Sequence, residues 1–328
     1  MTQNTYDEIS FDEYDEIDNP GPEQTGFEQV LESALSRRSF LRSGVVVGAS
    51  AFVMSSTFLG SKSGNAHNHV LDFQPVQANS LDTVTVPKGY NWQVVAKWGD
   101  PLWSKGSQFD QNTRGTASTQ ALAFGDNNDG MSLFKIDGRN VLVVNNEYTN
   151  RSIMFGNRES GKPETQDDIL KGKAAHGVSV VEVTENNGKW SIVKDSKFNR
   201  RITADTPMEI TGPARGHDLL KTSADPKGEI SLGTWNNCGN GRTPWGTYLA
   251  CEENFNGYFS SSDESFQPTA EMSRYGIKTK DWGYAWAKQD SRFDISKEPN
   301  EPNRAGYIVE IDPANPSSTP KKRTALGR

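Results

Sequence analysis

The sequence predicts an all-β fold, and three observations lead to this prediction. Short apolar runs recur along the chain, and turn residues separate them. The chain contains 30 glycines and 16 prolines, most of them after residue 66, which suits many short strands on tight turns. No segment shows a sustained helical period, and residues 166–173 are expected to form only one or two helical turns.

Five segments rich in β-branched or aromatic residues are expected to be strands. They are residues 140–149, 177–183, 189–195, 246–254 and 305–313. A turn at residues 136–139 precedes the first of them. Asn187-Gly188 lies between the second and third, and this dipeptide is typical of a two-residue hairpin turn.

A sandwich, a barrel and a propeller all accommodate many short strands. Strands that end in a polar or acidic tip and lead into long loops favour a β-propeller, although no repeat of fixed period is present. After the strand around residues 307–311 the chain runs ANPSSTPKKRTALGR, and no closing strand is expected there. Because an unclosed propeller exposes strand edges, we expect several blades of a six-bladed propeller in a fragment of a longer protein.

The N-terminal region has the pattern of a twin-arginine export signal. SRRSFL at residues 36–41 precedes a mildly apolar run, residues 44–60, that contains glycine and serine. We therefore expect export to the periplasm or the extracellular space, with cleavage near Ala66 and no stable membrane anchor. The apolar run is shorter than the ~20 residues that span a bilayer. The alternative is a basic helix end beside a buried helix.

Composition divides the chain into three regions. Residues 1–35 contain ten acidic residues and no Lys or Arg, so they are expected to be a disordered acidic extension. Residues 36–66 form the export segment, and residues 67–328 form the β domain. This domain contains 31 basic and 32 acidic residues. Its near-neutral charge argues against nucleic acid or an anionic membrane as a partner.

The inventory of metal-binding side chains favours oxygen and sulfur ligands. Two of the four histidines, His67 and His69, lie at the expected new N-terminus after cleavage, so only His176 and His217 lie in the body of the domain. This scarcity disfavours a zinc site built on several imidazoles. Carboxylates are abundant, so calcium or iron fits the composition better. His217 alone is more typical of a structural histidine than of a metal ligand.

The densest group of possible ligands lies in residues 233–259, GTWNNCGNGRTPWGTYLACEENFNGYF. Cys238 offers a soft, anionic ligand for iron, whereas Glu252 and Glu253 offer hard oxygens for iron or calcium. Neighbouring residues of a strand point to opposite faces, so only one glutamate can face a given site, and Glu253 is preferred. A disulfide between Cys238 and Cys251 is the alternative in an oxidising compartment, and Cys251 is otherwise expected to be a small core residue.

Two further segments contain acidic residues. Glu147, within NNEYTN at residues 145–150, is either a hard-cation ligand at a strand end or part of a turn. DNNDG at residues 126–130 does not match the EF-hand spacing and is expected to be a turn. The chain has no G-x-S-x-G, Walker or C-x-x-C motif, so a serine-triad hydrolase or a nucleotide-binding protein has no support.

Together these segments resemble the PhoX-type alkaline phosphatases. The likeness rests on the twin-arginine leader, on NNEYTN and above all on NNCGNGRTPWGTYLACEENFNGYF, and with YIVEIDP and TPKKRTALGR it covers about residues 80–328. The resemblance implies a β-propeller hydrolase of phosphate monoesters that contains iron (Fe³⁺) and calcium (Ca²⁺). It implies Cys238 as a thiolate ligand, and Glu253, Glu310 and Glu147 as carboxylates of the metal site. Glu252 is a weaker candidate.

The resemblance also implies a mechanism and partners. A metal-activated oxygen attacks phosphorus, no side chain acts as a covalent nucleophile, and inorganic phosphate is released for phosphate acquisition. The expected partners are a small phosphate ester and the twin-arginine translocation machinery, and the protein is expected to be a monomer. Two alternatives are a calcium-stabilised exported propeller that binds without catalysis and a phosphodiesterase on the same scaffold. Family members continue beyond a segment like TALGR, so this chain alone is expected to have an incomplete site.

Overall fold

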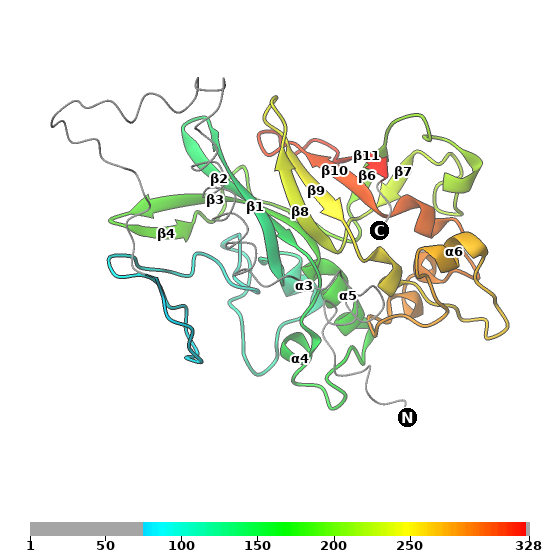
Figure 1. Cartoon of the computed structure of the whole chain (residues 1–328), viewed down its shortest axis with the longest axis horizontal. Helices are drawn as coiled ribbons and strands as arrows, with labels where there is room; N and C mark the ends of the chain where they lie inside the picture. The colour runs from blue at the N-terminus through cyan, green and yellow to red at the C-terminus, as the bar shows by residue number, and fades with distance from the viewer. Residues whose placement is uncertain (1–74, 326–328) are drawn as a thin grey trace, which may run out of the picture. The chain divides into compact units, whose positions relative to one another are not determined.

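The computed structural model describes residues 75–325, which belong to the second of two units of the chain, residues 1–74 and 75–328. The acidic extension, the twin-arginine segment and the expected boundary at residue 67 lie outside the described residues. The regular secondary structure of the described part is mostly β-strand, with a few short helices, which confirms the predicted all-β character (Figure 1). None of the helices between residues 75 and 325 has both the length and the apolar composition needed to cross a bilayer.

The first sheet in the described part has five strands, and all of its pairings are antiparallel. Its strands are β1 (Asn128–Ile136), β2 (Arg139–Asn146), β3 (Gly177–Asn186), β4 (Lys189–Ile192) and β5 (Arg200–Ile202). The order is β1-β2-β3-β4, and β5 also pairs with β3. The predicted Asn187-Gly188 hairpin joins β3 to β4, with φ of 52° and 78° at its two residues. Two successive positive φ values are what a type I′ turn requires.

The second sheet has six strands, in the order β7-β6-β11-β10-β9-β8 within residues 75–325 (Figure 1). These strands are β6 (Pro207–Ile210), β7 (Ile230–Leu232), β8 (Asn237–Arg242), β9 (Tyr248–Glu252), β10 (Tyr307–Ile311) and β11 (Lys321–Ala325). β11 and β6 are parallel, and the other neighbours are antiparallel. Four strands that follow one another in sequence, β8 to β11, therefore form an antiparallel meander.

The expectation that no strand follows residue 311 was wrong, because β11 pairs with β10. Lys321–Ala325 reads KKRTA, and such a charged segment has little strand propensity. Lys322 is nevertheless completely buried and forms an ion pair with Glu252. A tertiary partner thus makes a strand of a segment that local composition assigns to a loop. β8 escaped prediction in a similar way, because its glycine- and asparagine-rich sequence pairs with β9 through the backbone.

Helices are short throughout residues 75–325. They are α3 (Ala117–Gln120), α4 (Arg151–Met154), α5 (Gln166–Ala175) and α6 (Ala270–Arg274), with 3₁₀ turns η1 (Asp218–Leu220), η2 (Phe255–Tyr258), η3 (Trp286–Lys288), η4 (Ser291–Phe293) and η5 (Glu301–Arg304). α5 confirms the helix expected near residues 166–173. Thr165 and Asp168 form a capping box at its start, which satisfies backbone N–H groups of the first turn. His176 follows its last residue.

One hydrophobic core joins the two sheets. It contains residues from strands of both, together with Phe198: Phe134, Val141, Val143, Val178, Val180, Phe198, Ile202, Met208, Tyr248, Ala250, Val309 and Ile311. The first sheet is buried on both faces, because a second cluster that contains Leu102, Phe124, Val144, Val181 and Val183 packs on the side of β2 and β3 that faces away from this core. Neither sheet closes on itself between residues 75 and 325, so the described residues form two open sheets and no closed barrel or propeller.

Candidate metal centre

Cys238 lies in an irregular part of β8. The register between β8 and β9 shifts between Asn237 and Asn240, so Cys238 belongs to a bulge in the ladder. The side-chain amide of Asn145, near the end of β2, donates to the carbonyl oxygens of Cys238 at 2.9 Å and Gly239 at 3.0 Å. A bulge redirects the side chain that it contains. The first sheet therefore holds the bulge that sets the direction of the Cys238 thiol.

Negative charge surrounds this thiol. The pKa of Cys238 is raised to about 12, first by burial and then by Glu253, against a hydrogen bond from the Gly239 backbone that lowers it. Glu147 and Asp129 add smaller contributions in the same direction as Glu253. Of the predicted residues, Glu253 and Glu147 are therefore near enough to act electrostatically on the Cys238 thiol. Asp129 was missed because residues 126–130 were expected to form a turn. That expectation was wrong for residues 128–130, which begin β1 and pair with β2.

The residues around Cys238 fit the metals implied by the sequence in their chemistry. A thiol suits iron, and carboxylates suit iron or calcium. The nearby carboxylates repel a negatively charged thiolate and so disfavour it. A cation bound between them would attract both the carboxylates and the thiolate. Between residues 75 and 325, however, no three Cys, His, Asp or Glu side chains form a ready-made metal-binding group.

Asn236 joins the segments that contain Glu147 and Glu253. Its backbone N–H donates to the Glu147 carbonyl at 2.9 Å, and its own carbonyl accepts from the Glu253 N–H at 2.9 Å. Its side-chain oxygen accepts from the Asn254 N–H, also at 2.9 Å. The end of β2 and the end of β9 are far apart in sequence but are both bonded to this residue.

Glu252 has a different environment from its neighbour Glu253. Its carboxylate lies 2.9 Å from the Lys322 ammonium, and neither side chain is exposed. The same carboxylate accepts from the backbone N–H of Tyr307 at 3.0 Å. Glu252 is thus engaged by β10 and β11, whereas Glu253 raises the pKa of the Cys238 thiol.

Glu310 is not brought to Cys238. It lies in β10 opposite Leu249, and its carboxylate accepts hydrogen bonds from Trp245 Nε1 at 2.8 Å and Thr247 Oγ1 at 2.6 Å. Burial opposes ionisation of Glu310, but bonds from Thr247, Trp245 and Arg323 outweigh it and lower its pKa. These donors belong to the β8–β9 turn and to β11, whereas Cys238 lies at the opposite end of β8.

The two cysteines do not form a disulfide. Cys238 and Cys251 are both free, and each is partly buried. Cys251 lies within β9, where burial raises the pKa of its thiol. The thiol of Cys238 therefore stays available as a ligand, and Cys251 has the environment of a small residue in a strand.

The two histidines of the described part occupy structural positions. His217 is exposed and caps η1, with its Nδ1 accepting from the Leu219 N–H at 3.2 Å. His176 is completely buried among aromatic rings, with Nδ1 at 2.7 Å from the Gly172 carbonyl and Nε2 at 3.0 Å from the Tyr258 hydroxyl. Neither contacts Cys238 through a hydrogen bond.

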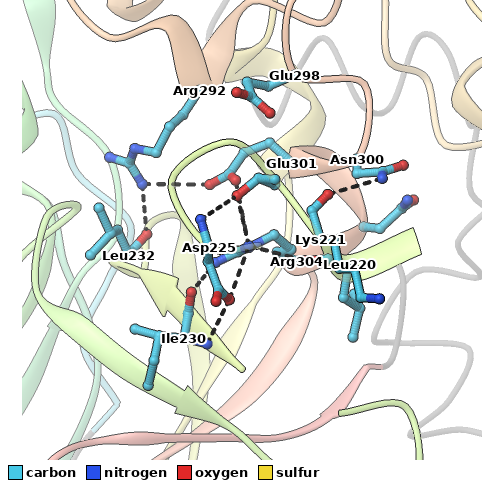
Figure 2. Close-up of polar contacts among 12 residues, drawn as sticks. Leu220, Lys221, Asp225, Ile230, Leu232, Arg292, Glu298, Asn300, Glu301 and Arg304 are labelled. Atoms are coloured by element: carbon cyan, nitrogen blue, oxygen red, sulfur yellow. Dashed lines mark hydrogen bonds and ion pairs between the residues drawn. The ribbon is translucent and has the colours of Figure 1, made fainter. Parts of the chain in front are cut away.

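One further group of buried carboxylates is paired with arginines. Figure 2 shows Glu301 between Arg292 and Arg304, and its oxygens lie 3.5 Å from a nitrogen of each. Arg304 also lies 3.4 Å from Asp225, and Arg292 donates to the Leu232 carbonyl at 3.0 Å. These contacts hold η4 and η5 against the β7 region. This cluster neutralises its own charges and has a structural role.

Comparisons with known proteins identify a family and a related structure. A family model described as "Alkaline phosphatase PhoX" matches residues 71–328. The structure of Pseudomonas fluorescens PhoX in complex with vanadate, a transition state analogue, is 49% identical in sequence, with a TM-score of 0.74. The match covers 78% of this chain and 44% of that one, so this chain spans less than half of its length. No curated protein matches the chain. On its family-model match and this identity, the chain belongs to the PhoX alkaline phosphatase family.

Proposed function

We propose that this chain contributes to the hydrolysis of phosphate esters and that Cys238, Glu253 and Glu147 hold metal ions for that reaction. The observation that carries the proposal is the electrostatic influence of Glu253 and Glu147 on the Cys238 thiol in a member of the PhoX family. The related Pseudomonas fluorescens protein binds vanadate, a transition state analogue, which supports phosphoryl chemistry.

Each of these residues suits a defined part of the task. A phosphate monoester is a dianion, so bound iron and calcium would supply the positive charge and Lewis acidity that hydrolysis needs. Cys238 provides the soft ligand for iron, and the bulge in β8 sets its direction. Glu253 and Glu147 provide hard oxygens, and Asn236 holds the backbone of both. No side chain is required as a covalent nucleophile.

We also propose that the two sheets are blades of a β-propeller. Propeller blades are four-stranded sheets, and two such antiparallel meanders occur here, β1 to β4 and β8 to β11. The shared core between them is consistent with neighbouring blades. Export by the twin-arginine route to the periplasm or the extracellular space is proposed from residues 36–60.

Replacing Cys238 with alanine tests the metal assignment. Loss of residues that only support a metal ligand commonly costs 10–100-fold, so loss of the ligand itself should lower p-nitrophenyl phosphate hydrolysis by at least about 100-fold. The bound iron, measured by elemental analysis, should fall in parallel. Cys251→Ala is the matched control, because Cys251 is the other partly buried free thiol and lies in the neighbouring strand.

Two results would contradict the proposal. One is a Cys238→Ala protein that keeps its iron and its activity, and the other is a wild-type protein that contains zinc and no iron. Hydrolysis of bis-p-nitrophenyl phosphate, measured alongside the monoester, separates a phosphodiesterase from a phosphomonoesterase.

A further inference from the structure

We infer that Asn236 is a positioning residue for the candidate metal centre, held in place by a buried hydrogen-bond chain through Tyr258 and His176. Asn236 forms hydrogen bonds with the backbone of Glu147 and Glu253, and these bonds do not use the carboxylate oxygens that would bind metal. The inference rests on the proposed function for the nature of the bound ion. The hydrogen-bond chain itself is independent of that function.

Asn236 forms several short hydrogen bonds from a buried position. Asn236 is only 1% exposed, and its N–H, its carbonyl and its side-chain oxygen each form a 2.9 Å hydrogen bond. These bonds reach the residues after β2 and the residues after β9. The backbone of Asn236 therefore joins both carboxylate-bearing segments, and its side chain fixes the position of that backbone.

The backbone of Asn236 has an unusual conformation. Its φ is 52°, in the left-handed region that non-glycine residues seldom adopt. Asparagine tolerates this region better than most residues, but the conformation still needs support from its surroundings. The side-chain hydrogen bonds of Asn236 provide that support.

The donors and acceptors of the hydrogen-bond chain can be assigned from the Gly172 carbonyl onward. The Gly172 carbonyl can only accept, so His176 Nδ1, at 2.7 Å, bears the hydrogen and Nε2 is an acceptor. The Tyr258 hydroxyl, at 3.0 Å from Nε2, therefore donates to it. The Tyr258 oxygen then accepts from Asn236 Nδ2 at 3.2 Å. This orientation of the amide leaves Oδ1 for the Asn254 N–H, as its 2.9 Å bond requires.

Tyr258 and His176, which support Asn236, are tightly packed among aromatic rings. The Tyr258 ring stacks on Tyr284 with centroids 4.0 Å apart, and the His176 ring meets Trp286 edge-on at 4.9 Å. Both Tyr258 and His176 have no exposed surface. Their positions are therefore fixed by packing, and the end of α5 determines where Asn236 holds the two glutamates.

Two variants test this inference in the full chain. Asn236→Gly keeps the left-handed backbone accessible but removes the amide, and Tyr258→Phe removes only the hydroxyl that accepts from that amide. In metal-free protein, hydrogen exchange of the Asn254 amide, which loses its Oδ1 acceptor, should become about tenfold faster in Asn236→Gly, the usual effect of one lost hydrogen bond, and several-fold faster in Tyr258→Phe. The Glu253 amide keeps its bond to the backbone carbonyl of residue 236, so its exchange should rise by a smaller factor. Calorimetric Ca²⁺ affinity should fall by about 10–100-fold in both.

The control is Tyr307→Phe, the same change at a buried tyrosine of β10 that has no bond to Asn236. It should leave exchange at Glu253 and Asn254 and the Ca²⁺ affinity unchanged. Exchange rates at these amides that match wild type in both test variants would overturn the inference, as would faster exchange with wild-type Ca²⁺ affinity. A wild-type protein that binds neither Ca²⁺ nor iron would instead refute the proposed function, and the exchange data would still decide whether the chain positions these segments.

Discussion

Replacing Lys322 with methionine is expected to lower the free energy of unfolding by about 3–5 kcal/mol. The Lys322 ammonium lies 2.9 Å from the Glu252 carboxylate, and both side chains are completely buried. Methionine leaves that carboxylate without its cation in a region that water does not reach, and an unpaired buried charge is costly. Urea denaturation at neutral pH measures the loss.

Two controls separate the buried charge from the loss of lysine as such. In Glu252→Gln/Lys322→Met no charge is left unpaired, so the double variant should regain much of the lost stability. Lys197→Met breaks an ion pair with Asp137 in which both side chains are more than half exposed, and it should cost less than about 1 kcal/mol. If Lys322→Met were no worse than Lys197→Met, the structural role of Glu252 would be excluded. Iron content is expected to be unchanged in Glu252→Gln.

The second large effect is loss of stability in acid caused by His176. Burial lowers its pKa to about 3, from an ordinary value of 6.5. Below pH 6.5 the unfolded chain binds a proton at this residue, whereas the folded chain does so only near pH 3. The free energy of unfolding therefore falls as the pH drops through this window. Between pH 7 and pH 4.5 the contribution of His176 should be about 2–3 kcal/mol.

The measurement compares the unfolding free energy of wild type and His176→Gln across that pH range. Glutamine does not titrate and offers an oxygen to the Tyr258 hydroxyl, so the variant should lose less stability on acidification. Acidic groups such as Asp126, whose pKa burial raises to about 6, affect both proteins equally and cancel in the difference. His217→Gln is the control, because His217 is exposed. Equal pH dependence in wild type and His176→Gln would rule out this account of His176.

Local signals predicted three of the five strands of the first sheet, β2, β3 and β4, and missed β1 and β5. Asn187-Gly188 identified a hairpin because both residues adopt positive φ without help from the rest of the molecule. The apolar strands β2 and β3 were recognised from composition alone. β8 and β11 were missed because glycine, asparagine and lysine have low strand propensity, and distant partners stabilise both strands.

The residues of the candidate site were likewise predicted only in part from the sequence. The unusual segment around Cys238 identified the family and its most informative ligand. It did not separate Glu253, which lies beside the thiol, from Glu310, which three donors hold near the β8–β9 turn. It also assigned no role to His176, because the hydrogen bond to Tyr258 joins residues 82 positions apart.

The amino-acid sequence by itself determined the β character, the hairpin turns and the family, because these depend on neighbouring residues and on motifs. Only the tertiary structure decided which carboxylates surround Cys238, which one is neutralised by Lys322, and how Asn236 is held. Those outcomes depend on burial and on hydrogen bonds between distant segments. Their energies arise only when the two sheets pack together and exclude water.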